Sequence, residues 1–505
     1  MQDYVKIIFL KRLVKVICDK KEVSYQQLQE LTGLPEEYLD NLLLMLGNYV
    51  EELELPDEGL CYKATDDTYM LLTVEEDFWK TLPGFDRLKM FEKEIKILTK
   101  EDPLLFLAKT VSKVHKGDKK LIVLAILSAI SPWAGSEIIN LFPVGRSGKG
   151  KSSLCASTLL IMPSWAKETI SSTSPLAPYY AIKRGLLNDN KILYFDDVKA
   201  NPVFIEVIKT FSGGMKIRPR HWTVDERRRF IDIKPEHRYS VWLTSVNPIA
   251  DDQLKNRFVL ANVDESIEQD KRVWKYLDEI YRKAKEKSVI EDPDFQMAQN
   301  VVNILIQEPA QVIVPYKVQF PILFDRRSYI YFIVAVKVAA FIRKFQRKVI
   351  DGKIIATRQD FEVARKIWQE IGRYQFLKID ADSYRILSVL GVGPENGLTY
   401  SEIMEKVKEK HGISISRQKI ARRCQKDLTE MNLVSGEKIG TWRWWINEDL
   451  SVAIDLSNIK SFEATKEDLE EFGIKPTEEN LNYINEVKET ELLKFMETIE
   501  DGEED

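Results

Sequence analysis

The sequence predicts an α/β core followed by a helical lid, with a winged-helix domain on either side. Three observations support this fold class. A short apolar stretch runs directly into a glycine-rich loop and then into a helical pattern, as at the ligand-binding edge of an α/β sheet. Two later apolar stretches of strand length also end in polar side chains. Short helical patterns joined by glycine turns flank this region, a pattern typical of winged helices.

The composition is that of an ordinary globular protein. The chain has 505 residues, of which 44% are hydrophobic and 30% charged, with a formal net charge of −5. Because the net charge is negative, nucleic-acid contacts must come from local basic patches. The four cysteines are too far apart in sequence for a cysteine-rich zinc site, which favours a reducing compartment. Without a signal-peptide pattern or an apolar run long enough to cross a bilayer, we expect a cytoplasmic protein with no membrane partner.

Residues 1–75 are expected to form the first winged-helix domain. Its helices are expected at residues 4–17, 24–32 and 35–46, and its wing strands at residues 60–64 and 68–73. The third helix begins with acidic side chains, whereas a DNA-reading helix should be basic. The domain is therefore expected to contact a replication protein rather than DNA. Residues 76–137 follow as a helical connector that breaks at Asp102-Pro103.

The glycine-rich loop follows a predicted strand at residues 138–144 and fits the phosphate-loop pattern G-x-x-x-x-G-K-[ST]. Its glycines let backbone N–H groups converge on phosphate oxygens, and the following helix presents its positive end to them. Lys151 would reach the β- and γ-phosphates, and Ser152 would bind Mg²⁺, so ATP and Mg²⁺ are the expected cofactors. The alternative is a chance glycine-rich turn. The expected nucleotide contacts are Gly145, Gly148, Lys149, Gly150, Lys151, Ser152 and Ser153.

A second predicted strand, residues 191–198, ends in two carboxylates. Asp196 would hold Mg²⁺ through water, and Asp197 would orient the attacking water. A simple Asp-Asp turn is the alternative. A third strand at residues 239–246 is followed by Asn247, whose amide could hydrogen-bond the attacking water or the γ-phosphate. Arg257 could stabilise transition-state charge on a neighbouring subunit's nucleotide, the alternative being a surface arginine.

With these residues in place, residues 117–373 resemble the AAA+ ATPases. Within that class they look most like the replicative hexameric helicases of the minichromosome maintenance and superfamily 3 groups. The stretch NRFVLANVDESIEQDKRVWKYL resembles the segment that carries the arginine finger, here Arg257. The sequence FDRR at residues 324–327 resembles the start of the sensor-2 helix, which implies that Arg327 or Arg326 contacts the γ-phosphate. A surface ion pair is the alternative for this arginine.

Two departures from that family are visible. Asp197 stands where a glutamate is usual, and the sequence shows no counterpart of the N-terminal zinc-binding and OB-fold domain. The resemblance therefore implies a compact helicase of plasmid or viral style.

A hairpin is expected near residues 213–234, between the second and third strands. In the resembling helicases a hairpin at this place grips DNA in the central channel. Its strands are expected at residues 216–218 and 229–233, and its tip is expected to carry Arg218, Arg220, His221, Trp222 and residues 227–229. The clustered arginines could bind phosphates, and an aromatic residue could stack on a base. The alternative is an edge hairpin whose arginines pair with neighbouring carboxylates. The expected DNA contacts are Lys216, Arg218, Arg220, Arg227 and Arg228.

Residues 379–456 are expected to form the second winged-helix domain, with helices at 380–390, 399–411 and 416–431 and a wing at 435–446. Ser416 is expected to cap the third helix, and Trp444 or Trp445 is expected in the core rather than stacked on bases. A basic third helix with a basic wing is typical of a duplex binder, although winged helices also dock proteins. The expected DNA contacts are Arg417, Lys419, Arg422, Arg423, Lys438 and Arg443. Residues 457–505 are expected to form an acidic, solubilising tail that is disordered beyond residue 495.

The core is placed at residues 138–315 and its helical lid at 316–378. The sequence thus predicts an ATP-dependent DNA translocase or helicase that forms a ring, expected to be a hexamer, in DNA replication. The alternative is a replication initiator or helicase loader in which ATP acts as a switch. A transcriptional activator or packaging motor on the same core is a third possibility.

Overall fold

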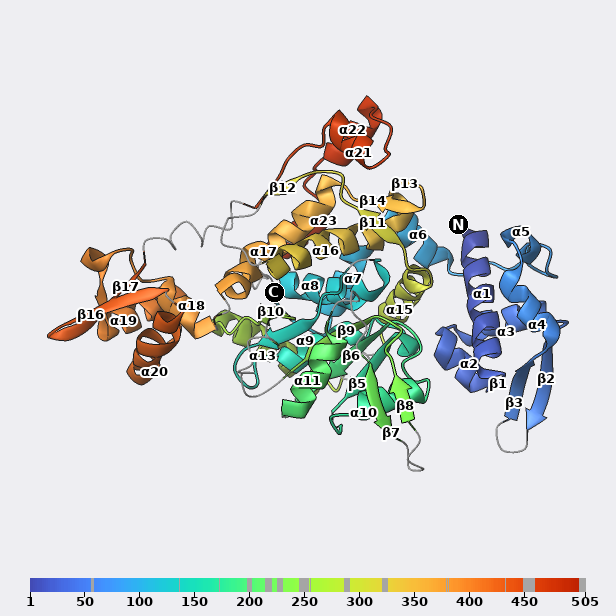
Figure 1. Ribbon diagram of the computed structural model, residues 1–505, viewed down its shortest axis with the longest axis horizontal. Coiled ribbons are helices and arrows are strands. Elements are labelled where there is room, and N and C mark those ends of the chain that lie inside the picture. The colour runs from blue at the N-terminus through green and yellow to red at the C-terminus, as the bar shows by residue number, and fades with distance from the viewer. Residues whose placement is uncertain are drawn as a thin grey trace.

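The computed structural model places two small units at opposite ends of an α/β body, as Figure 1 shows. It describes residues 1–55, 59–135, 137–171, 173–197, 202–213, 220–224, 230–244, 254, 256–285, 291–319, 326–377, 379, 381–431, 433–447 and 459–498. Five predicted site residues lie outside these ranges: Lys216, Arg218, Arg227, Arg228 and Asn247. Among the described helices, none combines the length and the apolar character needed to cross a bilayer.

The body is built on a parallel five-stranded sheet with the order β10-β4-β9-β6-β5. Its strands are β4 (Leu141–Val144), β5 (Lys167–Ile170), β6 (Lys191–Phe195), β9 (Tyr239–Leu243) and β10 (Val259–Asn262). The three strands predicted from the sequence are confirmed as β4, β6 and β9, each with shorter bounds. Because all five strands are parallel, their carboxyl ends meet at one edge, where an α/β protein binds its ligand.

The two faces of the sheet belong to two separate apolar clusters, because successive strand residues point to opposite sides. Ile192 and Tyr194 of β6 join one cluster, whereas Leu193 and Phe195 join the other. The second cluster is closed by α10 (Ala177–Lys183) and α11 (Pro202–Phe211). Both β6 and β9 are buried along their whole length, as strands covered on both faces should be.

Helices far apart in sequence contribute to the apolar cluster on the first face. They are α6 (Glu92–Lys100), α7 (Pro103–Ser112), α8 (Lys119–Ile130), α9 (Lys151–Leu159), α15 (Pro293–Ile306), α16 (Arg326–Ile342) and α17 (Arg358–Leu377). The expected break at Asp102-Pro103 is confirmed, since α6 ends and α7 begins there. The helices α16 and α17, predicted as a lid, pack directly on α7 and α8, predicted as a connector. Beside them lies a small sheet of β11 (Gln311–Ile313), β13 (Val349–Ile350) and β14 (Lys353–Ile355).

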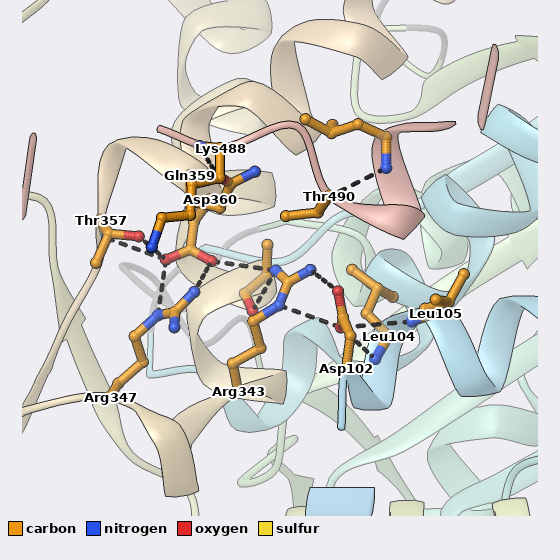
Figure 2. A network of polar contacts seen from close by, with 12 residues as sticks. Asp102, Leu104, Leu105, Arg343, Arg347, Thr357, Gln359, Asp360, Lys488 and Thr490 are labelled. Atoms are coloured by element: carbon orange, nitrogen blue, oxygen red, sulfur yellow. Dashed lines mark hydrogen bonds and ion pairs between the residues drawn. The ribbon is translucent and has the colours of Figure 1, made fainter. Parts of the chain in front are cut away.

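A buried ion cluster ties three of these helices together (Figure 2). Asp360, in the first turn of α17 and 0% exposed, accepts hydrogen bonds from Arg343 at 3.1 Å and from Arg347 at 2.7 and 3.0 Å. Arg343 also donates to Asp102 at 2.8 Å, and Asp102 caps α7. Burial alone would raise the pKa of Asp360, but the charges of Arg347 and Arg343 outweigh it and lower the pKa. The cluster fixes the start of α17 against the start of α7.

The N-terminal unit has three main helices and a three-stranded sheet of order β1-β3-β2. In chain order these are α1 (Gln2–Lys20), β1 (Glu22–Ser24), α2 (Tyr25–Thr32), α3 (Glu36–Met45), β2 (Val50–Leu55) and β3 (Gly59–Ala64). The strand expected at residues 68–73 is wrong. That segment is helical, as α4 (Asp66–Met70) and a 3-10 turn (Leu71–Thr73), because Thr65 and Thr68 form a capping box. The hairpin partner of β3 is β2. A short α5 (Glu76–Trp79) follows.

The C-terminal unit repeats this order of elements. It comprises α18 (Ala381–Leu387), β15 (Leu398–Thr399), α19 (Tyr400–His411), α20 (Arg417–Arg422), β16 (Val434–Ile439) and β17 (Thr441–Ile446). A π-helical stretch, Arg423–Leu428, continues α20. The expected cap of the third helix is confirmed, since the Ser416 hydroxyl accepts from the backbone N–H of Lys419. Trp444 is buried in this unit's own core, as expected.

Residues 457–505, expected as an acidic, solubilising tail that is disordered beyond residue 495, are folded in their described part. The strand β18 (Lys460–Ser461) pairs with β12 (Val318–Gln319) of the body. Three helices follow: α21 (Lys466–Glu471), α22 (Glu478–Asn485) and α23 (Glu491–Glu497). Leu492, Leu493 and Met496 of α23 are buried in the main core. The acidic average of this segment concealed apolar residues spaced so that each helix can bury one face.

Candidate nucleotide-binding site

The phosphate loop has the predicted context of strand, loop and helix. It follows β4 directly, and α9 begins at Lys151 with Gly150 as its N-cap residue. Gly148 and Gly150 have φ angles of 77° and 90°, which only glycine adopts without strain. The unpaired N–H groups of the first turn of α9 therefore open at the end of the loop, where an anion is favoured.

The ammonium group of Lys151 lies over the loop itself. Its Nζ donates to the carbonyl oxygens of Gly145 at 2.8 Å and Arg146 at 2.7 Å. Burial lowers the pKa of this ammonium, partly opposed by the nearby carboxylates of Glu265 and Asp197. The Lys151 side chain is thus held at the loop, and it is one of the residues that line a cavity of about 650 Å³.

Asp196 follows the last residue of β6 and is held by three hydroxyl groups. The Oδ1 atom of Asp196 accepts hydrogen bonds from the hydroxyl groups of Ser152 at 3.0 Å, Tyr194 at 2.7 Å and Thr244 at 2.8 Å. Burial would raise the pKa of Asp196, but these hydrogen bonds lower it overall, which keeps the carboxylate ionised. The structure thus brings together the two residues predicted to hold Mg²⁺. Their hydroxyl and carboxylate oxygens are ligands that Mg²⁺ accepts, in combination with water and phosphate oxygens.

The described residues contain no group of three or more histidine, cysteine, aspartate or glutamate side chains arranged to hold a metal ion. A divalent ion would therefore depend on the nucleotide's own oxygens for part of its coordination.

Asp197 has a strained backbone at the edge of the cavity. Its φ angle is 47°, in the left-handed region, and its N–H donates to Thr244 Oγ1 at 3.0 Å. Thr244 directly follows β9, the strand between β4 and β6, so its hydroxyl contacts both aspartates. The sequence reasoning missed Thr244, although its place at the end of a predicted strand was a usable signal. The catalytic role of Asp197 stays a prediction.

The wall of the cavity that faces the phosphate loop was also missed by the sequence reasoning. It comes from the turn between α7 and α8 and from α13 (Ile267–Arg282). Lys149, expected at the nucleotide, is bound by Asp270 of α13 at 2.7 and 2.5 Å. Gln269 donates to the carbonyl oxygen of Lys116, and an added Cβ at Gly117 would lie 2.1 Å from the Gln269 side chain. This close packing of turn against helix makes the wall continuous.

The C-terminal unit reaches the phosphate loop through charged side chains. Arg146 of the loop donates its N–H to Glu265 at 2.6 Å, and its guanidinium lies 3.5 Å from Asp382 of α18. Arg385 pairs with both Glu265 at 3.3 Å and Asp382 at 2.8 Å. Lys419 of α20 also pairs with Asp382. Lys419, which was predicted to contact DNA, is therefore connected to Arg146 of the phosphate loop through the carboxylate of Asp382.

The predicted arginine finger and sensor lie elsewhere. The guanidinium of Arg257 donates to the carbonyl oxygen of Lys209 at 2.7 Å, near the end of α11. Arg326 and Arg327 are exposed in the first turn of α16. None of the three lines the cavity of its own chain. Contacts of Arg257 or Arg327 with a neighbour's nucleotide stay predictions.

The predicted hairpin is present in its described part, with shifted strands. It consists of β7 (His221–Val224) paired antiparallel with β8 (Phe230–Ile233). His221 and Trp222, expected at the tip, lie in β7 instead, where His221 stacks on Tyr179 with ring centroids 4.4 Å apart. Arg220 pairs with Asp232 at 2.8 Å, which is the alternative considered for this arginine. Trp222 and Phe230 are 67% and 66% exposed, and their rings contact each other.

The predicted basic residues of the C-terminal unit fall into two groups. Arg417, Arg422 and Lys438 are exposed. Arg423 pairs with Asp427 within its own helix, and Arg443 donates to the carbonyl oxygen of Gly397 at 2.8 Å from an exposed position. Together with Lys419, these side chains lie on the third helix and the wing strands.

A parallel α/β sheet, a glycine loop that opens onto a helix N-terminus and a carboxylate held by the loop's serine define a P-loop nucleotide-binding domain. Residues 89–308 match a family described as the MTBMA_p00010 P-loop domain. The chain is similar to an uncharacterized protein, MTBMA_p00010, of Methanothermobacter marburgensis, with 25% identity over 304 residues. This match covers 57% of the chain and 37% of the length of that protein.

Proposed function

We propose that this chain is an ATP-hydrolysing AAA+ motor that forms a ring, a hexamer, and moves along or unwinds DNA during replication. The observation that carries the hydrolytic part is the 3.0 Å hydrogen bond between Ser152 of the loop and Asp196 at the sheet edge. It sets a hydroxyl and an ionised carboxylate side by side where a nucleotide's Mg²⁺ would bind.

The residues of the cavity have distinct roles in this proposal. Lys151 exchanges its two loop carbonyls for phosphate oxygens, which form stronger hydrogen bonds because they are charged. Ser152 and Asp196 hold Mg²⁺, which neutralises charge that develops on the phosphates. Asp197 orients the attacking water from its strained position beside Thr244. Arg257 completes the site of an adjacent subunit, so a monomer hydrolyses ATP poorly.

The DNA-binding part is supported by the exposed face of the β7–β8 hairpin. Trp222 and Phe230 form an aromatic pair that is two-thirds exposed, which is costly in water unless the surface has a partner. Aromatic side chains of this kind stack on unpaired bases without regard to sequence. The hairpin is therefore proposed to bind single-stranded DNA, and the basic residues of the C-terminal unit are proposed to bind the phosphates of duplex DNA.

The test is ATP-dependent displacement of a labelled strand from a forked duplex. The intact protein should displace the strand, whereas Lys151→Ala should not, and removal of Mg²⁺ with EDTA should abolish displacement. Trp222→Ala combined with Phe230→Ala should keep hydrolysis but lose displacement. The matched control is Leu44→Ala, an apolar residue that is 81% exposed on the N-terminal unit and should have no effect. Equal displacement by the hairpin variant and the control would overturn the role of the hairpin.

A second candidate function is an ATP-switched initiator or helicase loader. The ion pairs between Asp382, Arg146 and Lys419 favour it, because they connect a basic helix to the phosphate loop. In that case ATP should change duplex affinity severalfold without strand displacement. Duplex binding that is independent of ATP, together with displacement, would exclude this candidate.

A further inference from the structure

A histidine outside the phosphate-loop motif lies against the loop's helix. His115 belongs to the turn between α7 and α8 and is 4% exposed, yet it lines the cavity. Its Nδ1 lies 3.1 Å from Oγ of Ser153, in the first turn of α9. Its Nε2 lies 3.2 Å from Oδ2 of Asp118. The ring therefore connects a carboxylate to a hydroxyl group at the nucleotide site.

Asp118 determines which ring nitrogen carries the hydrogen. An ionised carboxylate only accepts hydrogen bonds, so Nε2 of His115 must donate to it. The other oxygen of Asp118 accepts from the backbone N–H of Asp264 at 2.8 Å, so the carboxylate is held from two sides. In a neutral imidazole, Nδ1 then has no hydrogen and can only accept one from the Ser153 hydroxyl.

The direction of this hydrogen bond decides what Ser153 offers to a nucleotide. While its hydrogen points to a neutral His115, the hydroxyl presents only lone pairs to the cavity, and these repel phosphate oxygens. When His115 gains a second proton, Nδ1 donates to Ser153 and the hydroxyl hydrogen can turn to a phosphate oxygen. Histidine is the side chain whose charge ordinarily changes between about pH 5 and 8.

Charged groups from several elements line the same cavity as His115. They are Lys116 and Asp118 on its own turn, Asp264 beyond β10, Asp270 on α13, Lys149 and Lys151 on the loop, and Asp196 and Asp197 at the sheet edge. Asp270 already binds Lys149, whereas Lys151 donates to the loop carbonyls and would turn to the phosphates of a bound nucleotide. A bound polyphosphate adds negative charge to this balance, so it favours the protonated ring.

We propose that His115 is a proton-linked positioning residue of the nucleotide site. Binding of a nucleotide polyphosphate draws one proton from solvent onto Nδ1 of His115, reverses the hydrogen bond to Ser153 and aims that hydroxyl at the phosphates. No bond to the nucleotide is made or broken, and the proton returns to solvent on release. The proposal rests on nucleotide binding in this cavity and is independent of any motion on DNA.

The test is calorimetric titration of the full chain with Mg²⁺ and the ATP analogue AMP-PNP between about pH 6 and pH 8. Two buffers with different ionisation enthalpies report the number of protons taken up. The wild-type protein should take up close to one proton more than a variant that cannot protonate at residue 115, and its affinity relative to that variant should fall up to about tenfold per pH unit. His115→Asn places an amide that can donate to Ser153 at every pH, so it should bind well but without proton uptake. Ser153→Ala should also lose the uptake.

Several outcomes separate the possibilities. Ionisation of the nucleotide's terminal phosphate is common to all variants, so it cancels in the comparison with wild type. Proton uptake at the wild-type level in both His115→Asn and Ser153→Ala would overturn the proposal. If His115→Asn does not fold, Ser153→Ala decides the question, because Ser153 is exposed and its replacement leaves the core intact. Failure of the wild-type protein to bind AMP-PNP at any pH would instead overturn the nucleotide site itself.

Discussion

The two small units at the ends of the molecule have the same topology but are attached in different ways. Each runs helix, strand, helix, helix, strand, strand, and each sheet places the last strand in the middle. Each second helix starts with a capping box, at Ser24 and at Thr399, and ends at a left-handed glycine, Gly33 and Gly412. The same local signals therefore build both units.

The difference lies in where their buried side chains belong. The N-terminal unit shares one continuous apolar cluster with the helices of the body. Its Arg12 also stacks on Trp165 and pairs with Asp189 at 2.9 Å. The C-terminal unit has an apolar cluster of its own and meets the phosphate loop through Asp382 and Arg385. The same topology thus occurs once with its buried side chains in the main apolar cluster and once with a cluster of its own, joined to the phosphate loop by charged contacts.

The largest expected effect separates the two cores. Phe9→Ala removes a side chain that is 0% exposed and packs on Phe91, at a cost of about 3–5 kcal/mol. Because its cluster is continuous with that of α8, hydrogen exchange should speed up in residues 121–130 as well as in α1. The matched variant Ile403→Ala, at an equally buried site of the C-terminal cluster, should speed up exchange only within residues 381–447. If hydrogen exchange in residues 121–130 is the same in Phe9→Ala as in the wild type, the N-terminal unit does not share its core with the body and the two units do not differ in this respect.

A smaller effect is expected at the charged joint. Asp382→Asn leaves Arg385, Lys419 and Arg146 without a shared carboxylate, which should weaken the joint by about 3 kcal/mol. Hydrogen exchange of α18 should become faster, while hydrogen exchange of α8 should stay the same. The control Asp427→Asn breaks a partly exposed pair within one helix and should cost about 0.5 kcal/mol or less.

The same joint has a pH signature. Burial would raise the pKa of Asp382, but its hydrogen bonds and the charges of Lys419, Arg385 and Arg146 lower it. Since the folded-state pKa is depressed, the stabilisation is present above the unfolded-state value of about 3.9 and is lost as the pH falls through the folded-state pKa. Protection of α18 should therefore fall in acid in the wild-type protein and depend less on pH in Asp382→Asn. An identical pH dependence in both would show that other carboxylates hold the joint.

The smallest expected effect is that of salt. Raising the ionic strength from about 0.1 M to about 1 M shortens the Debye length from about 10 Å to about 3 Å. Exchange of the C-terminal unit should increase by a factor of a few, while the N-terminal unit, held mainly by apolar burial, should not respond. The half-buried contacts at Asp382 limit the size of the change.

The sequence was most informative where a local signal decides the structure. The phosphate loop, the strand before Asp196, the cap at Ser416 and the break at Asp102-Pro103 are all found where their patterns predicted them. The strand β2 was missed because its sequence, VEELEL, is acidic and only weakly alternating. The helices after residue 459 were missed because average composition hides the spacing of a few apolar residues.

The wall that faces the phosphate loop could not be predicted. His115, Asp118 and Asp270 come from a turn and a helix on either side of the loop in sequence, and only packing brings them together. Each belongs to a residue type that is common on protein surfaces, so no spacing pattern marks it. The same limit applies to the contacts of Asp382 with Arg146 and of Arg385 with Glu265, because each pair joins residues far apart in the chain.

The pairing of β18 with β12 has a consequence for limited proteolysis. The chain leaves the body after α17, passes through the C-terminal unit and returns to the body at residue 459. A single peptide-bond cleavage between Asn447 and Ile459 would therefore divide the polypeptide without separating its pieces. The short fragment would stay bound by its strand pairing and by Leu492, Leu493 and Met496, so the nicked protein should elute as one species and separate only after denaturation.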